Sequence, residues 1–211
     1  MLNLFEEQDK VYKSITKLSF VASKNLTIQI GIQGEENYTA IVNHLLKHPS
    51  QTLSINSKKF QLQQLKFNFE MFNPATMEYK PFDKFVLHFY SPTFVRNINI
   101  TYLLPNPDQF LYSVWTKLQE LYAFAIDEET FKKRLKNTIY VGEFDLGSKL
   151  VQIKGGKKAG VVGFCTYYVR DTAHKEFVRL LYLILHAIKF LGVGSSTKLG
   201  CGNVGCFITK K

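Results

Sequence analysis

The sequence predicts an α+β protein of two tandem ferredoxin-like (RRM-like) domains, the first of which lacks its opening strand and helix. Stretches with the two-residue period of half-buried strands alternate with stretches that have the spacing of amphipathic helices. In the second part of the 211-residue chain these stretches follow the order β-α-β-β-α-β, which is the ferredoxin-like order. The first part shows only β-β-α-β. We therefore expect an incomplete domain over residues 1–80 and a complete one over residues 81–211.

Three sequence signals predict the elements of the first domain: alternating hydrophobic residues, apolar residues at helical spacing, and residues that end an element. Residues 17–32 are strand-like, with clear alternation in their second half. Apolar residues at helical spacing predict a helix over 38–47, which Pro49 ends. Residues 51–72 form a second β stretch, and the polar segment 73–81 reads as a linker.

The second domain is predicted in the same way. A strand is expected at 85–90, followed by a break at Ser91-Pro92-Thr93, and Pro107 introduces a helix over 108–122. The remaining elements are, in chain order, a strand at 138–144, a Gly- and Lys-rich connection at 149–158, a strand at 159–169, a helix at 172–191 and a strand at 203–209.

Charge is distributed unevenly along the chain. The protein has 27 Lys and Arg against 17 Asp and Glu, a net charge of +10. The first 130 residues hold 12 basic and 13 acidic side chains, whereas residues 131–211 hold 15 basic and 4 acidic ones, a net charge of +11. A domain this basic is typical of proteins that bind a polyanion, because neutralised phosphates release counterions. A basic surface that is merely solvated is the alternative.

Composition narrows the protein class. A hydrophobic content of 45% is ample for a buried core and excludes disorder of the whole chain. No apolar run approaches the ~20 residues that span a bilayer, and no charged-then-apolar leader opens the chain, so we expect a cytoplasmic protein with no membrane partner. The three cysteines include no C-x-x-C pair. Neither a disulfide framework nor a zinc site is indicated, and we expect no metal and no cofactor.

A glycine-rich segment follows the last predicted helix. Four glycines in a G-x-G-x₅-G-x-G frame enclose hydroxyl side chains and one lysine: Gly192, Gly194, Ser195, Ser196, Thr197, Lys198, Gly200 and Gly202. Such a loop can present amides and hydroxyls to phosphate oxygens. A dinucleotide-binding fingerprint is excluded, because that motif follows a strand and opens a helix. A tight turn with a packing role remains the alternative.

These residues resemble a known family, the CRISPR-associated repeat-processing endoribonucleases of the RAMP superfamily. The family has a similar glycine-rich loop between the last helix and last strand of its second ferredoxin-like domain. Residues 88–96 (HFYSPTFVR) with 104–113 (LPNPDQFLYS) are similar to the opening of that domain, and residues 159–164 (AGVVGF) are similar to its third strand. The resemblance extends well over residues 80–211 and only by element order over 17–72.

The resemblance implies binding of the repeat stem-loop of a CRISPR precursor transcript and cleavage at its base. In such enzymes the 2′-hydroxyl attacks the adjacent phosphate without a metal, which requires a base, an acid and a stabilising cation or hydroxyl. Other CRISPR effector-complex subunits are the expected protein partners. Two alternatives stay open: a non-catalytic subunit that retains the 3′ stem-loop of the mature crRNA, and a generic ferredoxin-like module. In the latter, Phe164, Tyr167 and Tyr168 either stack bases or pack in the core.

Candidate RNA-binding residues follow from the basic hairpin and the glycine-rich loop. Four lysines fall within ten residues of the hairpin, a density suited to the phosphates of an A-form stem. A solvated lysine hairpin is the alternative. We expect RNA contacts from the glycine-rich loop residues named above and from Lys149, Lys154, Lys157, Lys158, Arg170 and Lys175.

The catalytic histidine of the family lies at the end of a first helix that this chain does not show. Sixteen residues precede the strand-like stretch at 17–32, and none of them is histidine. The chain is then a shortened member, or receives the strand and helix from another chain, or is not catalytic. The best local set of base, acid and stabiliser is His44, His48, Tyr38 and Lys47; exposed surface histidines are the alternative.

Three further histidines are expected to have other roles. We expect His88 to pack or stack, His174 to be solvated in the first turn of the last helix, and His186 to be a satisfied, partly buried side chain.

Overall fold

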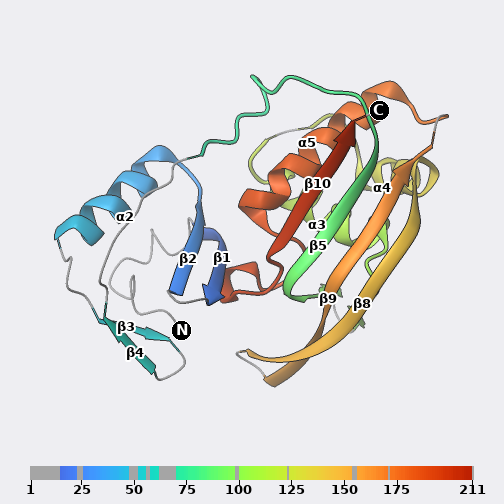
Figure 1. Ribbon diagram of the computed structural model, residues 1–211. Helices are drawn as coiled ribbons and strands as arrows, with labels where there is room; N and C mark the ends of the chain where they lie inside the picture. Colours follow the sequence, from blue (N-terminus) through green and yellow to red (C-terminus); the bar gives the residue numbers. More distant parts are fainter. Residues whose placement is uncertain are drawn as a thin grey trace.

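A computed structural model gives the fold (Figure 1) and describes residues 15–22, 26–47, 52–55, 58–61, 70–97, 100–122, 124–153, 156–170 and 172–210. The first part of the chain holds an antiparallel pair of strands, β1 (Ile15–Ala22) and β2 (Leu26–Ile32), followed by helix α2 (Glu35–Lys47). A separate hairpin of β3 (Thr52–Ile55) and β4 (Lys58–Gln61) comes next. This is the expected β-β-α-β order, with the last strand resolved into a hairpin.

The second part is a four-stranded antiparallel sheet covered on one face by helices (Figure 1). Its strands lie in the order β10-β5-β9-β8, so the first strand of the domain is central and the last lies at the edge. This is the ferredoxin-like arrangement that the element order predicts. The strands are β5 (Phe82–Thr93), β8 (Ile139–Ile153), β9 (Gly156–Val169) and β10 (Val204–Lys210). The helices are α3 (Pro107–Gln119), α4 (Glu128–Thr138) and α5 (Lys175–Leu191).

Alternation in the strands directs one set of side chains to the helices. In β5, Phe85, Leu87 and Phe89 are buried, and in β9 Cys165 and Tyr167 are buried. They pack against apolar faces of α3 and α5 in one continuous core. Tyr167 also donates a 2.5 Å hydrogen bond from its hydroxyl to the Pro105 carbonyl. The alternative in which Tyr167 packs in the core is therefore confirmed.

The structure corrects several predicted boundaries. Helix α4 and the short hairpin of β6 (Val95–Asn97) and β7 (Ile100–Tyr102) were not predicted. The expected break at Ser91-Pro92-Thr93 is wrong, because β5 continues to Thr93 and only its register with β9 shifts there. The connection expected at 149–158 is largely paired strand, since β8 extends to Ile153 and β9 begins at Gly156.

Residues 70–81 form neither helix nor strand, in keeping with a linker. In the part of the chain that the structure describes, no helix is long and apolar enough to cross a membrane.

Candidate nucleic-acid interface

The glycine-rich segment forms a closed loop between α5 and β10. Gly192 ends the helix at φ 65°, and the Val193 amide donates to the Gly202 carbonyl at 3.0 Å, which closes the base of the loop. Residues Thr197–Leu199 form one turn of 3₁₀ helix, designated η2. Ser196, just before this turn, has φ 60°, a left-handed conformation that is uncommon outside glycine. The loop is therefore held in a single shape by its own backbone.

The loop is seated on the end of β5, on Phe94 just after it, and on helix α3. The amides of Gly194, Ser195 and Gly202 donate to Ser113 Oγ, the Phe94 carbonyl and the Pro92 carbonyl at 2.8, 2.8 and 3.2 Å. A Cβ on Gly194 would lie 2.2 Å from the Phe94 carbonyl oxygen, so only glycine fits there. These amides donate within the protein, which supports the packing interpretation for this part of the loop.

The side chains of the loop are placed differently. Ser195 Oγ accepts a 3.0 Å hydrogen bond from the Arg96 amide, so its own hydroxyl proton is directed elsewhere. Thr197 is buried, and Lys198 is partly exposed. Contact of Ser195, Ser196, Thr197 and Lys198 with RNA phosphates stays a prediction.

Two lysines hold the carbonyl end of α5, immediately before the loop. Lys17 Nζ, from β1, donates to the Lys189 carbonyl at 3.1 Å. Lys117 Nζ, from α3, donates to the Leu191 and Gly192 carbonyls at 3.2 Å each. The last carbonyls of a helix lack partners within the helix and carry its negative dipole end, so ammonium groups stabilise them. Neither lysine was singled out from the sequence.

Burial sets the protonation of both lysines. Desolvation, with a smaller contribution from Lys189, lowers the pKa of Lys17 to about 8. Desolvation lowers the pKa of Lys117 to about 7; Glu120 opposes this shift and Lys17 adds to it. Near neutral pH, Lys117 is therefore divided between the ammonium and the neutral amine, both of which can donate to two carbonyls.

Replacing Lys117 by Met should change how stability depends on pH. The ordinary pKa of lysine is 10.5 and that of folded Lys117 is about 7, so between these values the unfolded chain binds the extra proton. The free energy of unfolding of the wild-type protein should then rise with pH from about 7 to 10 through this group, by on the order of a few kcal/mol at most. Urea denaturation across this range measures it. Parallel pH curves for wild type and Lys117→Met would contradict the lowered pKa.

Strands β8 and β9 continue beyond the four-stranded sheet as a two-stranded arm (Figure 1). The arm carries the basic hairpin. Lys149 lies opposite Gly160 and Lys158 opposite Val151, so these two lysines share one face, whereas Lys157 lies opposite Gln152 on the other face. Lys149 and Lys157 are exposed and Lys158 is partly exposed. Lys154 lies outside the described residues.

The arm and the glycine-rich loop meet on the same short segment. Gly160 of the arm approaches Pro92 and Thr93 so closely that a Cβ there would lie 2.7 Å from their backbone. Pro92 in turn accepts the Gly202 amide of the loop. The segment Ser91–Arg96, which carries the S-P-T sequence, thus sets the loop against the base of the arm. The arm and the glycine-rich loop, which are distant in sequence, therefore meet at this segment.

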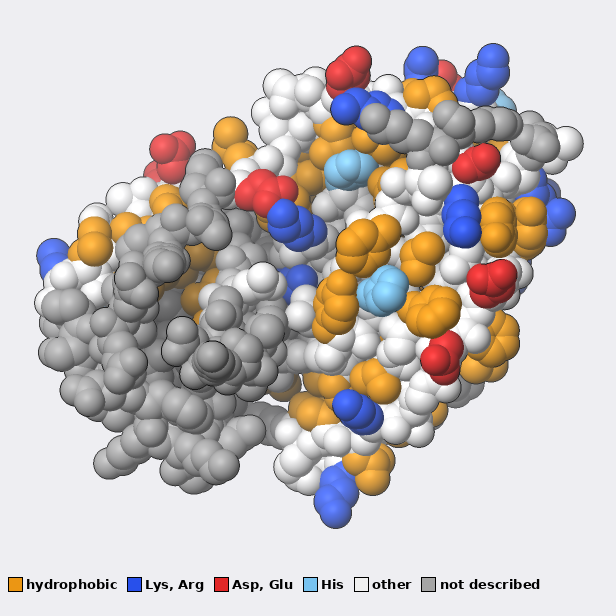
Figure 2. Space-filling model, in the orientation of Figure 1, with side chains coloured by type: hydrophobic (Ala, Val, Ile, Leu, Met, Phe, Trp, Pro, Cys, Tyr) orange, Lys and Arg blue, Asp and Glu red, His pale blue; other side chains and the backbone are white. Residues whose placement is uncertain are grey.

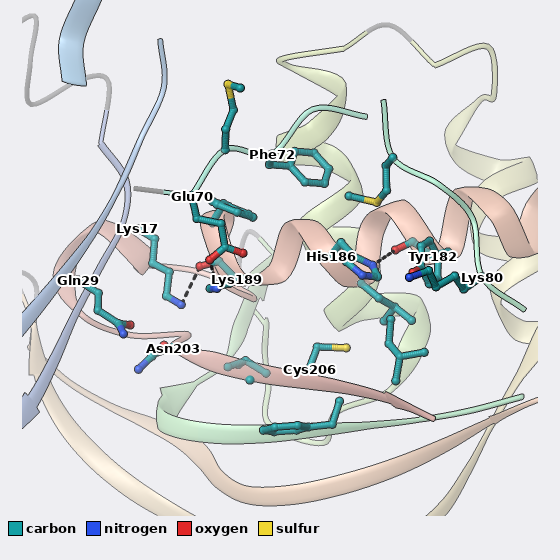
Figure 3. A pocket seen from close by; sticks show the side chains of 18 of the residues that line it. Lys17, Gln29, Glu70, Phe72, Lys80, Tyr182, His186, Lys189, Asn203 and Cys206 are labelled. Atoms are coloured by element: carbon teal, nitrogen blue, oxygen red, sulfur yellow. Dashed lines mark hydrogen bonds and ion pairs between the residues drawn. The ribbon is translucent and has the colours of Figure 1, made fainter. Parts of the chain in front are cut away.

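A cavity of about 970 Å³ lies between α5, β10 and the linker (Figure 3). Its walls combine cationic side chains with rings. Lys17, Lys80 and Lys189 line it, Lys189 being ion-paired with Glu70, together with Phe72 and Tyr182. Two of these ammonium groups already have partners, Lys17 with the Lys189 carbonyl and Lys189 with Glu70.

The described histidines lie in separate surroundings. His186 Nδ1 is 2.9 Å from the Tyr182 carbonyl, as expected of a satisfied, partly buried side chain (Figure 3). His88 stacks on Phe164 with ring centroids 5.6 Å apart, as expected. His174 is exposed and precedes the first turn of α5. These three expectations are confirmed.

The candidate catalytic set lies on α2, which is separated from the free end of the arm (Figure 1). His44 and Tyr38 are partly buried there and Lys47 is exposed; His48 lies outside the described residues. Ile41 and Leu45 of α2 pack against β2 in a small separate core. Arg170 follows β9 at the end away from the arm, and Lys175 begins α5; both side chains are exposed. The structure therefore does not bring the α2 set together with the loop and arm, and the set stays a prediction.

Comparison with known proteins bears directly on this loop and arm. A family model described as CRISPR-associated endoribonuclease Cas6 matches residues 87–204, more than half of the chain. The chain belongs to the Cas6 family. The matched region contains the Ser91–Arg96 segment, the β8–β9 arm and the glycine-rich loop, so the family assignment rests on the elements that form the basic surface.

Solved structures of this family share the fold. A Cas6 product complex has a TM-score of 0.80 at 19% identity and covers 96% of this chain and 87% of its own. A Cas6 substrate mimic complex gives 0.76 at 20% identity, with coverages of 94% and 86%. Thermus thermophilus Cas6 gives 0.71 at 17% identity, with coverages of 92% and 79%. A comparison with curated proteins gives no match. The tandem ferredoxin-like fold expected from the sequence is thereby confirmed.

Proposed function

We propose that this Cas6-family chain binds the stem-loop of a CRISPR repeat RNA and cuts the precursor transcript without a metal ion. The observation that carries the proposal is the joining of the lysine arm to the glycine-rich loop through Ser91–Arg96, within the region that matches the family. The arm offers cations to the phosphates of an A-form groove, where shape rather than base edges is read. The solved product and substrate mimic complexes of Cas6 support RNA as the ligand.

The proposed reaction breaks one phosphodiester bond. The 2′-oxygen attacks the adjacent phosphorus as a base removes its proton, and the 5′-oxygen leaves with a proton from an acid. The products are a 2′,3′-cyclic phosphate, or the 3′-phosphate formed from it, and a 5′-hydroxyl. His44, His48, Tyr38 and Lys47 are the candidates for base, acid and stabiliser in this chain.

Incubation of labelled repeat RNA with the purified chain in EDTA tests this function under single-turnover conditions. We expect shortened RNA with a 5′-hydroxyl end, and no cleavage of RNA that carries a 2′-deoxy group at the cut site, although that RNA should still bind. Full-length RNA remaining after binding is complete would contradict catalysis by this chain.

A second function is favoured by the placement of the described histidines. His88 is surrounded by the rings of Tyr90, Phe164 and Phe207, His186 is bonded to Tyr182, and His44 lies on α2, apart from the arm. This arrangement suits a non-catalytic subunit that retains the crRNA 3′ stem-loop beside other CRISPR effector subunits. Such a subunit should hold the stem-loop tightly and leave RNA ends unchanged whether or not His44 and His48 are replaced by Ala. Blocked processing in His44→Ala or His48→Ala would exclude it.

A further inference from the structure

The C-terminal sheet has a second face, opposite the helices, that carries exposed rings. Side chains that share this face alternate with the buried ones. On neighbouring strands it shows Phe207 of β10, His88 and Tyr90 of β5, and Phe164 of β9. Tyr90 is 60% exposed and Phe207 53% exposed. Figure 2 looks onto this face and shows hydrophobic side chains gathered over the sheet.

Two of the rings on this face lie against glycines of a neighbouring strand. A Cβ on Gly205 would lie 2.8 Å from the Tyr90 ring, and a Cβ on Gly142 would lie 2.4 Å from the Tyr168 ring. Each tyrosine therefore covers a position where the neighbouring strand has no side chain.

The rings contact one another: His88 is stacked against Phe164 and Tyr90 and meets the Phe207 ring edge-on, at 81°. The planes of His88 and Phe164 are 24° apart and those of His88 and Tyr90 27° apart, with centroids separated by 5.6 and 6.1 Å. At the far end of the sheet, Tyr140 and Tyr168 are stacked at 19°. In this cluster the exposed rings of Tyr90 and Phe207 offer aromatic surface on which planar groups can stack.

The cations on this face and its position next to the glycine-rich loop favour nucleotides as the planar groups that stack there. Lys84 Nζ lies over the Tyr168 ring, 5.5 Å from its centre, and Arg170 Cζ lies over the Tyr140 ring at 5.2 Å, so this end of the face is cationic. At the other end, the Tyr90 amide donates to the carbonyl of Asn203, where the glycine-rich loop ends. Asp145 lies beside Phe164 as an acceptor that suits a base amino group. The face is thus continuous with the proposed stem-binding surface.

We propose that this open sheet face binds unpaired nucleotides of the RNA, stacking their bases on Tyr90, Phe164 and Phe207, while the loop and arm hold the stem. The inference rests on the proposed function in taking repeat RNA as the ligand. It adds a second RNA-contact region, where the protein would bind bases by stacking rather than phosphates by charge.

Two RNA probes test the inference in the full chain. One is the repeat stem-loop alone, and the other is the same stem-loop with about eight unpaired nucleotides attached, a length that one small platform can cover. The extended probe should bind more tightly. The double variant Phe164→Ala/Phe207→Ala should lose roughly 10- to 100-fold in affinity for the extended probe, as expected when bases lose aromatic partners, and should bind the stem-loop alone as wild type does.

Phe144→Ala is the matched control. Phe144 is an exposed phenylalanine of the same sheet, but it lies opposite Cys165 and hence on the other face. Its replacement should leave both affinities unchanged. A 2-aminopurine base in the unpaired segment should be quenched on binding to wild type and to Phe144→Ala, and not on binding to the double variant. The single variant Phe207→Ala, at an exposed edge-strand position, gives the same comparison if the double variant does not fold.

Equal affinity of wild type for the two probes would overturn the inference while leaving the proposed function intact. Failure of wild type to bind the stem-loop at all would instead overturn the proposed function. If the double variant bound both probes normally but changed from dimer to monomer in sedimentation, the face would be an interface between two copies of the chain, and the inference would be wrong.

Discussion

Replacing Lys149, Lys157 and Lys158 together by Ala should weaken binding of the repeat stem-loop roughly 100-fold at moderate salt, because charge-assisted contacts contribute on the order of 1 kcal/mol each. The three lysines lie on the part of the β8–β9 arm that extends beyond β5, and none is part of the core. The free energy of unfolding should therefore change by no more than about 0.5 kcal/mol. Fluorescence anisotropy with labelled stem-loop measures the loss.

A control with the same change of charge comes from α4. This helix carries Lys132, Lys133 and Lys136. It lies on the helix-covered face of the sheet, away from the arm. Their joint replacement by Ala removes three positive charges from the same domain. Comparison of the two triple variants therefore separates the effect of where the charges lie from the effect of net charge. We expect a small effect on affinity. Equal losses from the two triple variants would mean that the RNA responds to the overall charge and not to the arm.

Replacing Gly194 by Ala should displace the glycine-rich loop from its seat. Gly194 has φ 77°, and a Cβ there would meet the Phe94 carbonyl oxygen at 2.2 Å. The strained φ and the collision with backbone together should lower the free energy of unfolding by ~2–4 kcal/mol. Because the Ser195 amide donates to the same carbonyl, movement at this point opens the loop. Stem-loop affinity should fall as well.

Urea denaturation and RNA titration of Gly194→Ala give both quantities. Gly147→Ala is the control, because the nearest atom to a Cβ at Gly147, Val162 Cγ2, is at 3.9 Å, an ordinary contact. Wild-type stability and affinity in Gly194→Ala would show that the loop is not held by its contact with Phe94.

The C-terminal domain was largely predictable because its elements have clear periods. In β5 and β9 the alternate residues Phe85 and Tyr167 face the helices, and His88 and Phe164 face outward; the sequence alone did not assign Phe164 and Tyr167 to different faces. Helix α4 was missed because its eleven residues are mostly charged, with Phe131 and Leu135 as its buried apolar residues. Its start could have been recognised, since Asp127 caps the Thr130 amide and two glutamates follow.

The seating of the glycine-rich loop was not predictable from sequence. Its contacts join residues that are distant in the chain, as in the bond from the Arg96 amide to Ser195 or from Lys17 to the end of α5. Local composition left open a phosphate-binding loop and a tight turn with a packing role, and the structure shows that several of its amides already donate within the protein. The local sequence of Lys17, which lies between Thr16 and Leu18, did not indicate the lysine pair at the end of α5.

The central claim is that the β8–β9 arm contacts RNA phosphates, and the salt dependence of binding tests it most directly. Stem-loop affinity would be measured for wild type and for Lys149→Ala/Lys157→Ala/Lys158→Ala at several salt concentrations. Each lost phosphate contact should reduce the slope of log K against log salt by about 0.7–0.9, so the slope of the triple variant should be smaller by about 2–3. An unchanged slope would show that the arm is not at the RNA interface.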